Sequence, residues 1–143
     1  MIAVQECMDM DIVVCDKDFS SFTEIEIKVS SSDLKNELKK DKHKHSQICN
    51  YYYIIVPLCL KDEALAVVEK LNTNYGVMLF IDGVFPTIKT IQRAKKTTGD
   101  PYLERVVINK LSSDYVKWYN KLQLYENDRL SNIPDMGNKA TTV

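Results

Sequence analysis

The stretch that most constrains the fold is an apolar run of aromatic and β-branched residues. Tyr51 to Leu58 contains no charged side chain, which is typical of a central strand buried in a sheet. A helical pattern follows over Lys61–Leu71, and a second apolar strand is expected over Val77–Ile81. A strand, a helix and another strand in this order predict a β-α-β unit within an α/β domain.

Further strands are expected on both sides of this unit. They lie over Ile2–Cys7, over Asp11–Cys15, within Phe19–Val29 and, more weakly, over Thr87–Arg93. The first three follow one another closely enough to form an antiparallel meander. In the third, isoleucine and valine alternate with glutamate and lysine, so one apolar and one charged face are predicted.

A helix is expected directly after the third strand. Ser30 is a candidate N-cap, and Asp33 would occupy the third helical position, where the positive end of the helix dipole favours an acid. This helix should continue to about Lys42. Its Leu34 and Leu38 are four residues apart and are expected to face the core.

A long amphipathic helix is predicted near the C-terminus, with apolar residues recurring from Leu103 to Leu122. We expect Trp118 on this helix to be a core residue. Residues 131–143 have no periodicity and are expected to be a disordered tail, which leaves residues 1–130 as one domain. A length of 143 residues with 45% hydrophobic content suits a single core.

The cysteines and the hydropathy bear on the cellular compartment. The four cysteines contain no C-x-x-C pair, and Cys15 and Cys49 beside apolar runs are predicted to be small core residues. No apolar stretch approaches the length of a membrane span, and the N-terminus lacks a signal-peptide pattern. These features predict a cytoplasmic protein without a membrane partner.

The candidate chemistry lies on two neighbouring strands. Asp11 stands in one apolar strand, and Glu26 and Lys28 stand two residues apart on the next, where alternate residues share a face. Two carboxylates, with the Ile27 carbonyl as a third ligand, would suit Mg²⁺ or Mn²⁺, and Lys28 would position or help deprotonate an attacking water. An ordinary strand with one solvated face has the same spacing of charged residues. On spacing alone, that explanation is favoured over a catalytic site.

A lysine-rich segment follows the third strand. Six lysines and three acids lie between Lys28 and His45, although the net charge of the whole chain is only −1. Lys35, Lys39 and Lys42 recur at helical spacing, so they could form a stripe that meets DNA phosphates. A solvated helix face explains the same pattern equally well.

The combined pattern resembles the PD-(D/E)xK nuclease superfamily, in particular small phage and bacterial members related to the MmcB-type DNA repair proteins. The resemblance covers roughly Ile2 to Ala94. The matching segments are Asp11, Glu26-Ile27-Lys28, Ser30-Ser31-Ser32-Asp33-Leu34, Lys39-Lys40-Asp41-Lys42-His43 and Asn50-Tyr51-Tyr52-Tyr53-Ile54-Ile55-Val56-Pro57.

The resemblance implies an α/β, restriction-endonuclease-like fold, in which a mixed sheet is flanked by helices. It implies a metal-dependent DNA nuclease with Asp11 and Glu26 as metal ligands and Lys28 as the catalytic lysine. By the same match Asp33, Lys39, Lys42 and His43 belong to the helix that borders the site. Our candidate DNA-binding residues are Lys35, Lys39, Lys42 and His43.

One departure from the superfamily pattern concerns its first helix, which often contributes a glutamate. Ile2 already belongs to the expected first strand, so that helix is not recognised here. The product could be shortened, a second protomer could supply the helix, or Glu6 or Asp9 could replace its acid. Two other functions therefore stay open: a binding module of the same fold that does not cleave, and a homodimeric interaction protein assembled through the Leu103–Leu122 helix.

Overall fold

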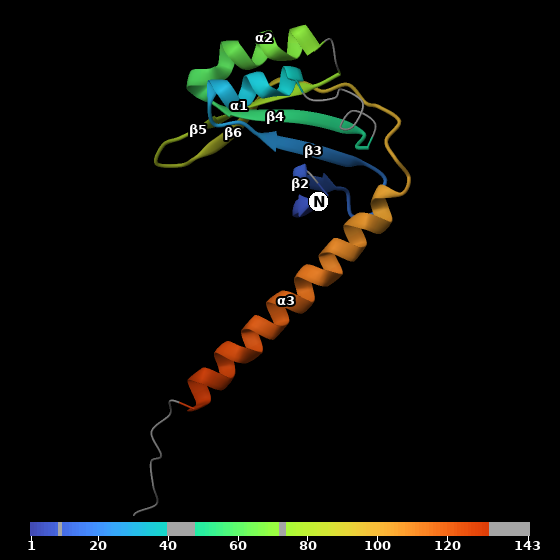
Figure 1. Cartoon of the computed structure of the whole chain (residues 1–143), viewed down its shortest axis with the longest axis vertical. Coiled ribbons are helices and arrows are strands. Elements are labelled where there is room, and N and C mark those ends of the chain that lie inside the picture. The colour runs from blue at the N-terminus through green and yellow to red at the C-terminus, as the bar shows by residue number, and fades with distance from the viewer. Residues whose placement is uncertain (9, 40–47, 72–73, 132–143) are drawn as a thin grey trace, which may run out of the picture. The chain divides into compact units, whose positions relative to one another are not determined.

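The fold is built on a six-stranded mixed β-sheet (Figure 1). The computed structural model describes residues 1–8, 10–39, 48–71 and 74–131. The strands are β1 (Ile2–Cys7), β2 (Met10–Cys15), β3 (Phe22–Ile27), β4 (Tyr51–Pro57), β5 (Gly76–Ile81) and β6 (Thr87–Gln92), and they lie in this order across the sheet. The helices are α1 (Ser31–Asn36), α2 (Lys61–Leu71) and α3 (Leu103–Ser131), with short 3₁₀ turns η1 (Glu37–Lys39) and η2 (Leu58–Leu60).

The strand directions confirm the predicted α/β class and mixed sheet. β1, β2 and β3 form the expected antiparallel meander. β4 lies parallel to both β3 and β5, so β4, α2 and β5 are the predicted β-α-β unit. β6 returns antiparallel to β5 and closes the sheet as an edge strand.

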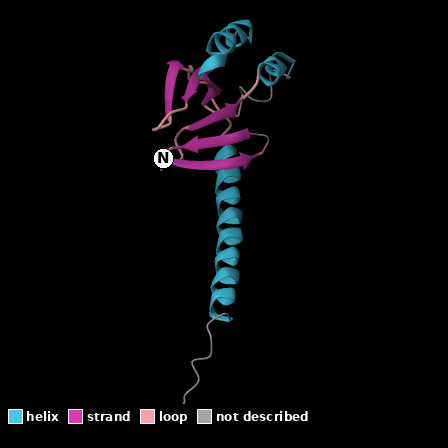
Figure 2. Cartoon of the chain, turned by 90° about the vertical axis from the view of Figure 1, so that its left-hand side faces the viewer, coloured by secondary structure: helices cyan, strands magenta, loops and turns pink. Residues whose placement is uncertain are grey.

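The core lies between the sheet and the pair of helices α1 and α2. Figure 2 shows the sheet with these two helices on the same side of it. The side chains that meet there are apolar and almost fully buried, among them Leu34, Ile54, Val56, Val67, Val68, Val77 and Leu79. This layer holds the β-α-β unit together and fixes where α1 begins relative to β3.

Helix α1 begins as predicted but ends earlier. Ser30 is the N-cap, and its hydroxyl accepts a hydrogen bond from the Asp33 amide at 3.2 Å. Leu34 is fully buried, whereas Leu38 is 36% exposed, so the expectation that both face the core is wrong for Leu38. The cause is the change to a 3₁₀ turn at Glu37, because three residues per turn bring Glu37 rather than Leu38 beneath Leu34.

The chain divides into two compact units, Met1–Ile108 and Asn109–Val143. Helix α3 begins in the first unit, where Leu103 and Val107 are buried. It extends to Ser131, beyond the predicted Leu122, so Ser131 is helical and is not part of a tail; residues 132–143 lie outside the described residues. Trp118 is 58% exposed, which contradicts its expected place in a core. The periodicity of apolar residues in the sequence identifies an apolar stripe on α3, but it does not show which surface, if any, packs against that stripe.

None of the described helices combines the length and the apolar character that a bilayer-spanning segment requires. All four cysteines are free, and Cys15 and Cys49 are buried as predicted.

Gly76 occupies a position with no room for a side chain. A Cβ atom there would collide with the Tyr53 ring and would lie 2.7 Å from the Ala94 backbone nitrogen. Gly83, in the turn between β5 and β6, would meet nothing within 4 Å. We therefore expect Gly76→Ala to lower the free energy of unfolding by about 1–3 kcal/mol through overpacking.

The matched control is Gly83→Ala, for which a change within about 0.5 kcal/mol is expected. Urea denaturation followed by circular dichroism measures both variants. Equal effects of the two substitutions would contradict the close approach of Tyr53 to Gly76.

Candidate functional site

Strand β3 turns its charged face into the protein. Glu24, Glu26 and Lys28 are 0%, 2% and 5% exposed, while Ile27 on the opposite face is 43% exposed. The explanation of these residues as a solvated strand face is therefore wrong. The charged side chains face the layer formed by α1 and α2, because Glu24 and Glu26 are in register with buried Tyr52 and Ile54 of β4.

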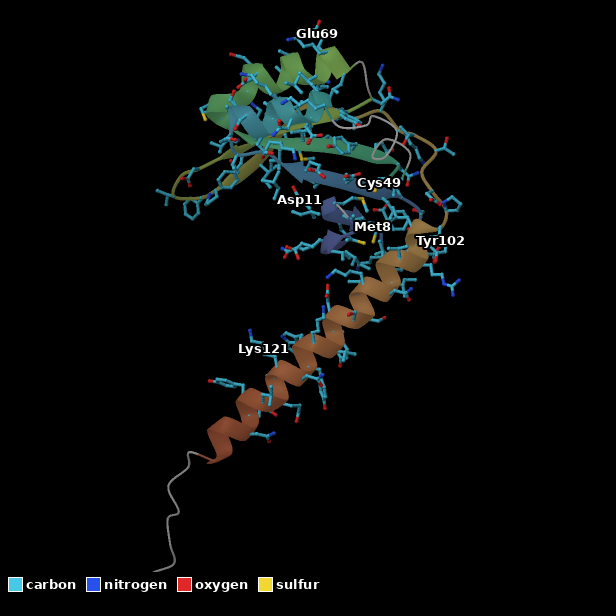
Figure 3. All side chains as sticks on the ribbon, in the orientation of Figure 1. Met8, Asp11, Cys49, Glu69, Tyr102 and Lys121 are labelled. Carbon is cyan, nitrogen blue, oxygen red and sulfur yellow. The ribbon has the colours of Figure 1, made fainter. Side chains whose placement is uncertain are left out.

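The register of β2 and β3 places the two predicted metal ligands on neighbouring strands. Ile12 pairs with Ile25, so the next position along this antiparallel ladder places Asp11 opposite Glu26 on one face of the sheet. Asp11 is partly exposed on β2 (Figure 3), and its Oδ2 accepts a hydrogen bond from the Ile27 amide at 2.8 Å. Asp11 therefore contacts the Ile27 backbone, and Glu26 and Lys28 contact each other, at neighbouring positions of the two strands.

Lys28 lies between two buried glutamates. Its Nζ is 2.7 Å from Glu26 Oε2 and 3.0 Å from Glu37 Oε1, and all three side chains are less than 10% exposed. Tyr52 donates its hydroxyl hydrogen to Glu37 Oε2 over 3.4 Å. We call Glu26, Lys28 and Glu37 the buried triad.

Sequence reasoning missed Glu37 as a member of the site. It was counted among the acids of a lysine-rich segment and given no role. Its one local signal is its position three residues after Leu34, which places it on the buried side if the helix tightens to 3₁₀ geometry. In the α-helix to Lys42 that we predicted, Leu38 rather than Glu37 would be the next buried position after Leu34, so the prediction gave no reason to place Glu37 inside.

The triad shifts the pKa values of its members and neighbours. Burial lowers the pKa of Lys28, but hydrogen bonds to Glu26 and Glu37 outweigh that effect and raise its pKa overall. Lys28 therefore stays protonated at neutral pH. Burial, together with the negative charges of the nearby glutamates, raises the pKa of Tyr52 and raises that of Tyr75 to about 12. Both phenols are therefore neutral.

The donor set at this end of β2 and β3 suits a hard divalent cation. Asp11, Glu26 and the Ile27 carbonyl offer oxygen atoms, the ligands that Mg²⁺ and Mn²⁺ prefer, and Mg²⁺ is usually held by one or two carboxylates with water completing the shell. The described residues contain no group of three or more His, Cys, Asp or Glu side chains placed to hold a metal. A cation at this position would be held by at most two carboxylates of the described residues, with water completing its shell.

The predicted DNA-binding residues are only partly within the described structure. Lys35 is exposed on α1, and its Nζ lies 3.0 Å from Glu63 Oε1 on α2. Lys39 is exposed on η1. Lys42 and His43 lie outside the described residues, as does Asp9, one of the two acids considered as a replacement ligand.

Removing the ammonium from the buried triad tests its contribution to stability. We expect Lys28→Met to lower the free energy of unfolding by about 3–5 kcal/mol, because Glu26 and Glu37 would stay buried without the cation between them. Lys35→Met is the matched control. The ion pair of Lys35 with Glu63 lies at the surface, with side chains 61% and 29% exposed, and should contribute little to the free energy of unfolding. Similar urea midpoints for the two variants would show that Lys28 does not neutralise buried charge.

The raised pKa of Tyr75 predicts a loss of stability at high pH. The phenol would ionise at about 10 in the unfolded chain and at about 12 in the fold, so the unfolded state binds fewer protons between these values. Stability should therefore be unaffected by this group below about pH 10 and should fall between about pH 10 and 12.

Tyr75→Phe should make the free energy of unfolding decline less steeply over that interval. Thermal unfolding at several alkaline pH values measures the slope. Identical slopes in the variant and the wild type would contradict the assignment to Tyr75.

Comparisons with known proteins support the fold and leave the chemistry open. No protein-family model matches the chain, and no curated protein matches its sequence. The structure is similar to that of SPO1766, a protein of unknown function from Silicibacter pomeroyi, with a TM-score of 0.63 and 18% sequence identity over 87% of this chain and 81% of that one. The part of the chain that the structure describes therefore has an α/β fold, a six-stranded mixed sheet with three helices, similar to that of a protein of unknown function.

Proposed function

We propose that this chain is a metal-dependent nuclease of restriction-endonuclease-like fold that hydrolyses phosphodiester bonds in DNA. The observation that carries the proposal is the placement of Asp11 and of the Glu26–Lys28 ion pair at the same end of two neighbouring strands, with Asp11 hydrogen-bonded to the Ile27 amide. The resemblance of the Asp and Glu-x-Lys pattern to the PD-(D/E)xK superfamily supplies the reaction type.

In this proposal each residue has a distinct task. Asp11 and Glu26, with the Ile27 carbonyl, hold Mg²⁺ or Mn²⁺, and the bound cation would offset phosphate charge and acidify its water. Lys28 acts as a fixed positive charge beside the scissile phosphate. Its raised pKa makes it a poor base, so electrostatic stabilisation and water positioning are favoured over deprotonation of water.

Glu37 is a positioning residue in this scheme. It contacts Lys28 Nζ at 3.0 Å, so the ammonium is held by Glu37 of η1 as well as by Glu26 of β3. The exposed Lys35 and Lys39 on the same segment would contact DNA phosphates.

The near-complete burial of Glu26 and Lys28 favours a second candidate function. A side chain that is 2% or 5% exposed can serve the fold alone, in which case the domain would bind nucleic acid through its surface lysines without cleaving it. Metal-dependent cleavage separates the two candidates.

The decisive variant is Asp11→Asn. Asparagine keeps an oxygen that can accept the Ile27 amide hydrogen, and it loses the charge that binds a cation. We expect metal-dependent nicking of plasmid DNA by the wild type, with a loss of at least about 100-fold in Asp11→Asn if the metal's catalysis depends on this ligand.

Asp62→Asn, an exposed position on α2, is the matched control and should retain full activity. EDTA should abolish cleavage, and Mg²⁺ or Mn²⁺ should restore it. A wild type that binds DNA but never cleaves it with either metal would refute the nuclease and favour the binding module.

A further inference from the structure

The second face of the sheet is apolar, and neither α1 nor α2 covers it. Helices α1 and α2 both lie on the other side (Figure 2). The three strands β3, β4 and β5 of this mixed sheet are parallel to one another, and sheets made of parallel strands alone almost always have both faces covered. The apolar face of this parallel part is therefore a candidate for contact with a partner surface.

This face contains a groove of about 450 Å³. The residues that line it are Ile12, Ile25, Ile27, Lys28, Val29, Ile55, Val56, Pro57, Met78, Phe80 and Ile88. Lys28 is the one charged residue among them, and its ammonium lies with Glu26 and Glu37 in the buried triad. A ligand in the groove would therefore meet carbon almost exclusively, which favours an apolar partner over a polar metabolite.

The same molecule carries an apolar projection beside the groove. The hairpin of β5 and β6 extends away from the layer of helices (Figure 1), and Phe80 and Ile88, which pair across it, line the groove. At its tip Val84 and Phe85 are 91% and 84% exposed. Two adjacent apolar side chains this exposed at a hairpin tip are unusual for a surface that meets only water.

We propose that a second copy of the chain covers this face, in a twofold-symmetric dimer in which the hairpin tip of each copy packs on the groove of the other. The groove and the apolar hairpin tip are on the same chain, so the tip of one copy can pack in the groove of the other. A twofold axis produces this contact twice, because each copy supplies one groove and one tip. The unpaired edge of β6 lies beside this contact.

The exposed area is sufficient for a stable dimer. Six apolar residues on this face and hairpin are at least 41% exposed: Ile27, Val29, Phe80, Val84, Phe85 and Ile88. At roughly 100 Å² each, below the about 150–250 Å² of a whole aromatic side chain, they supply roughly 600 Å² per copy. That value is at the lower end of the range of roughly 600–1,000 Å² per partner of a standard interface.

The test is the molar mass of the full chain in solution, measured by light scattering and sedimentation velocity. We expect a dimer for the wild type and at least a tenfold weaker dimer for the double variant V84S/F85S. Both side chains are almost fully exposed, so an unchanged circular dichroism spectrum and melting temperature of the monomer should accompany the loss. Ile88→Lys, at a 62% exposed position on the edge strand, is an independent second disruption.

The matched control is Y115S/Y125S, which removes two exposed aromatic residues from α3, 63% and 67% exposed, and should leave the dimer intact. A dimer that survives V84S/F85S and Ile88→Lys but is lost in Y115S/Y125S would overturn the proposal and assign assembly to α3. A monomeric wild type at micromolar concentration would overturn it as well. Because none of these variants touches Asp11, Glu26 or Lys28, the result is independent of nuclease activity.

Discussion

The ion pairs that Lys28 makes with Glu26 and Glu37 determine how the rest of the domain is arranged. Buried carboxylates are tolerated only when a positive charge or hydrogen bonds compensate for lost hydration. Lys28 meets that requirement with two contacts of 2.7 and 3.0 Å, one from its own strand and one from η1. The lysine therefore joins Glu26 of the sheet to Glu37 in η1, the segment after α1.

The two faces of the sheet differ in character. On the inward face, β3 carries charged groups amid the apolar side chains of β4 and β5, whereas the outward face carries isoleucine, methionine and phenylalanine. An ordinary strand with one wet face has the reverse arrangement. The proposed nuclease site gives the inward charges a chemical role. The proposed dimer interface, which is independent of it, gives the outward apolar side chains a surface to pack against.

Much of the fold was predictable because its signals are local. The bounds of β1 and α2, the N-cap at Ser30 and the β-α-β unit follow from periodicity and capping preferences over a few residues. That Glu26 and Lys28 share a face of one strand, next to the strand that carries Asp11, was predictable from alternation on two adjacent strands. Glu37 was not, because its inclusion depends on a change from α to 3₁₀ geometry that no residue pattern announces. Trp118 was misplaced because an amphipathic pattern specifies an apolar face without specifying what covers it.

The sequence by itself determined the order of strands and helices, the cap of α1 and the set of residues that share a face with Glu26. These properties depend on neighbours along the chain. Only the tertiary structure decided that the charged face of β3 is buried, that Glu37 completes the triad and that the apolar face is left open. These properties depend on the free energy of burial, which is set by contacts between residues far apart in sequence and which local periodicity does not contain.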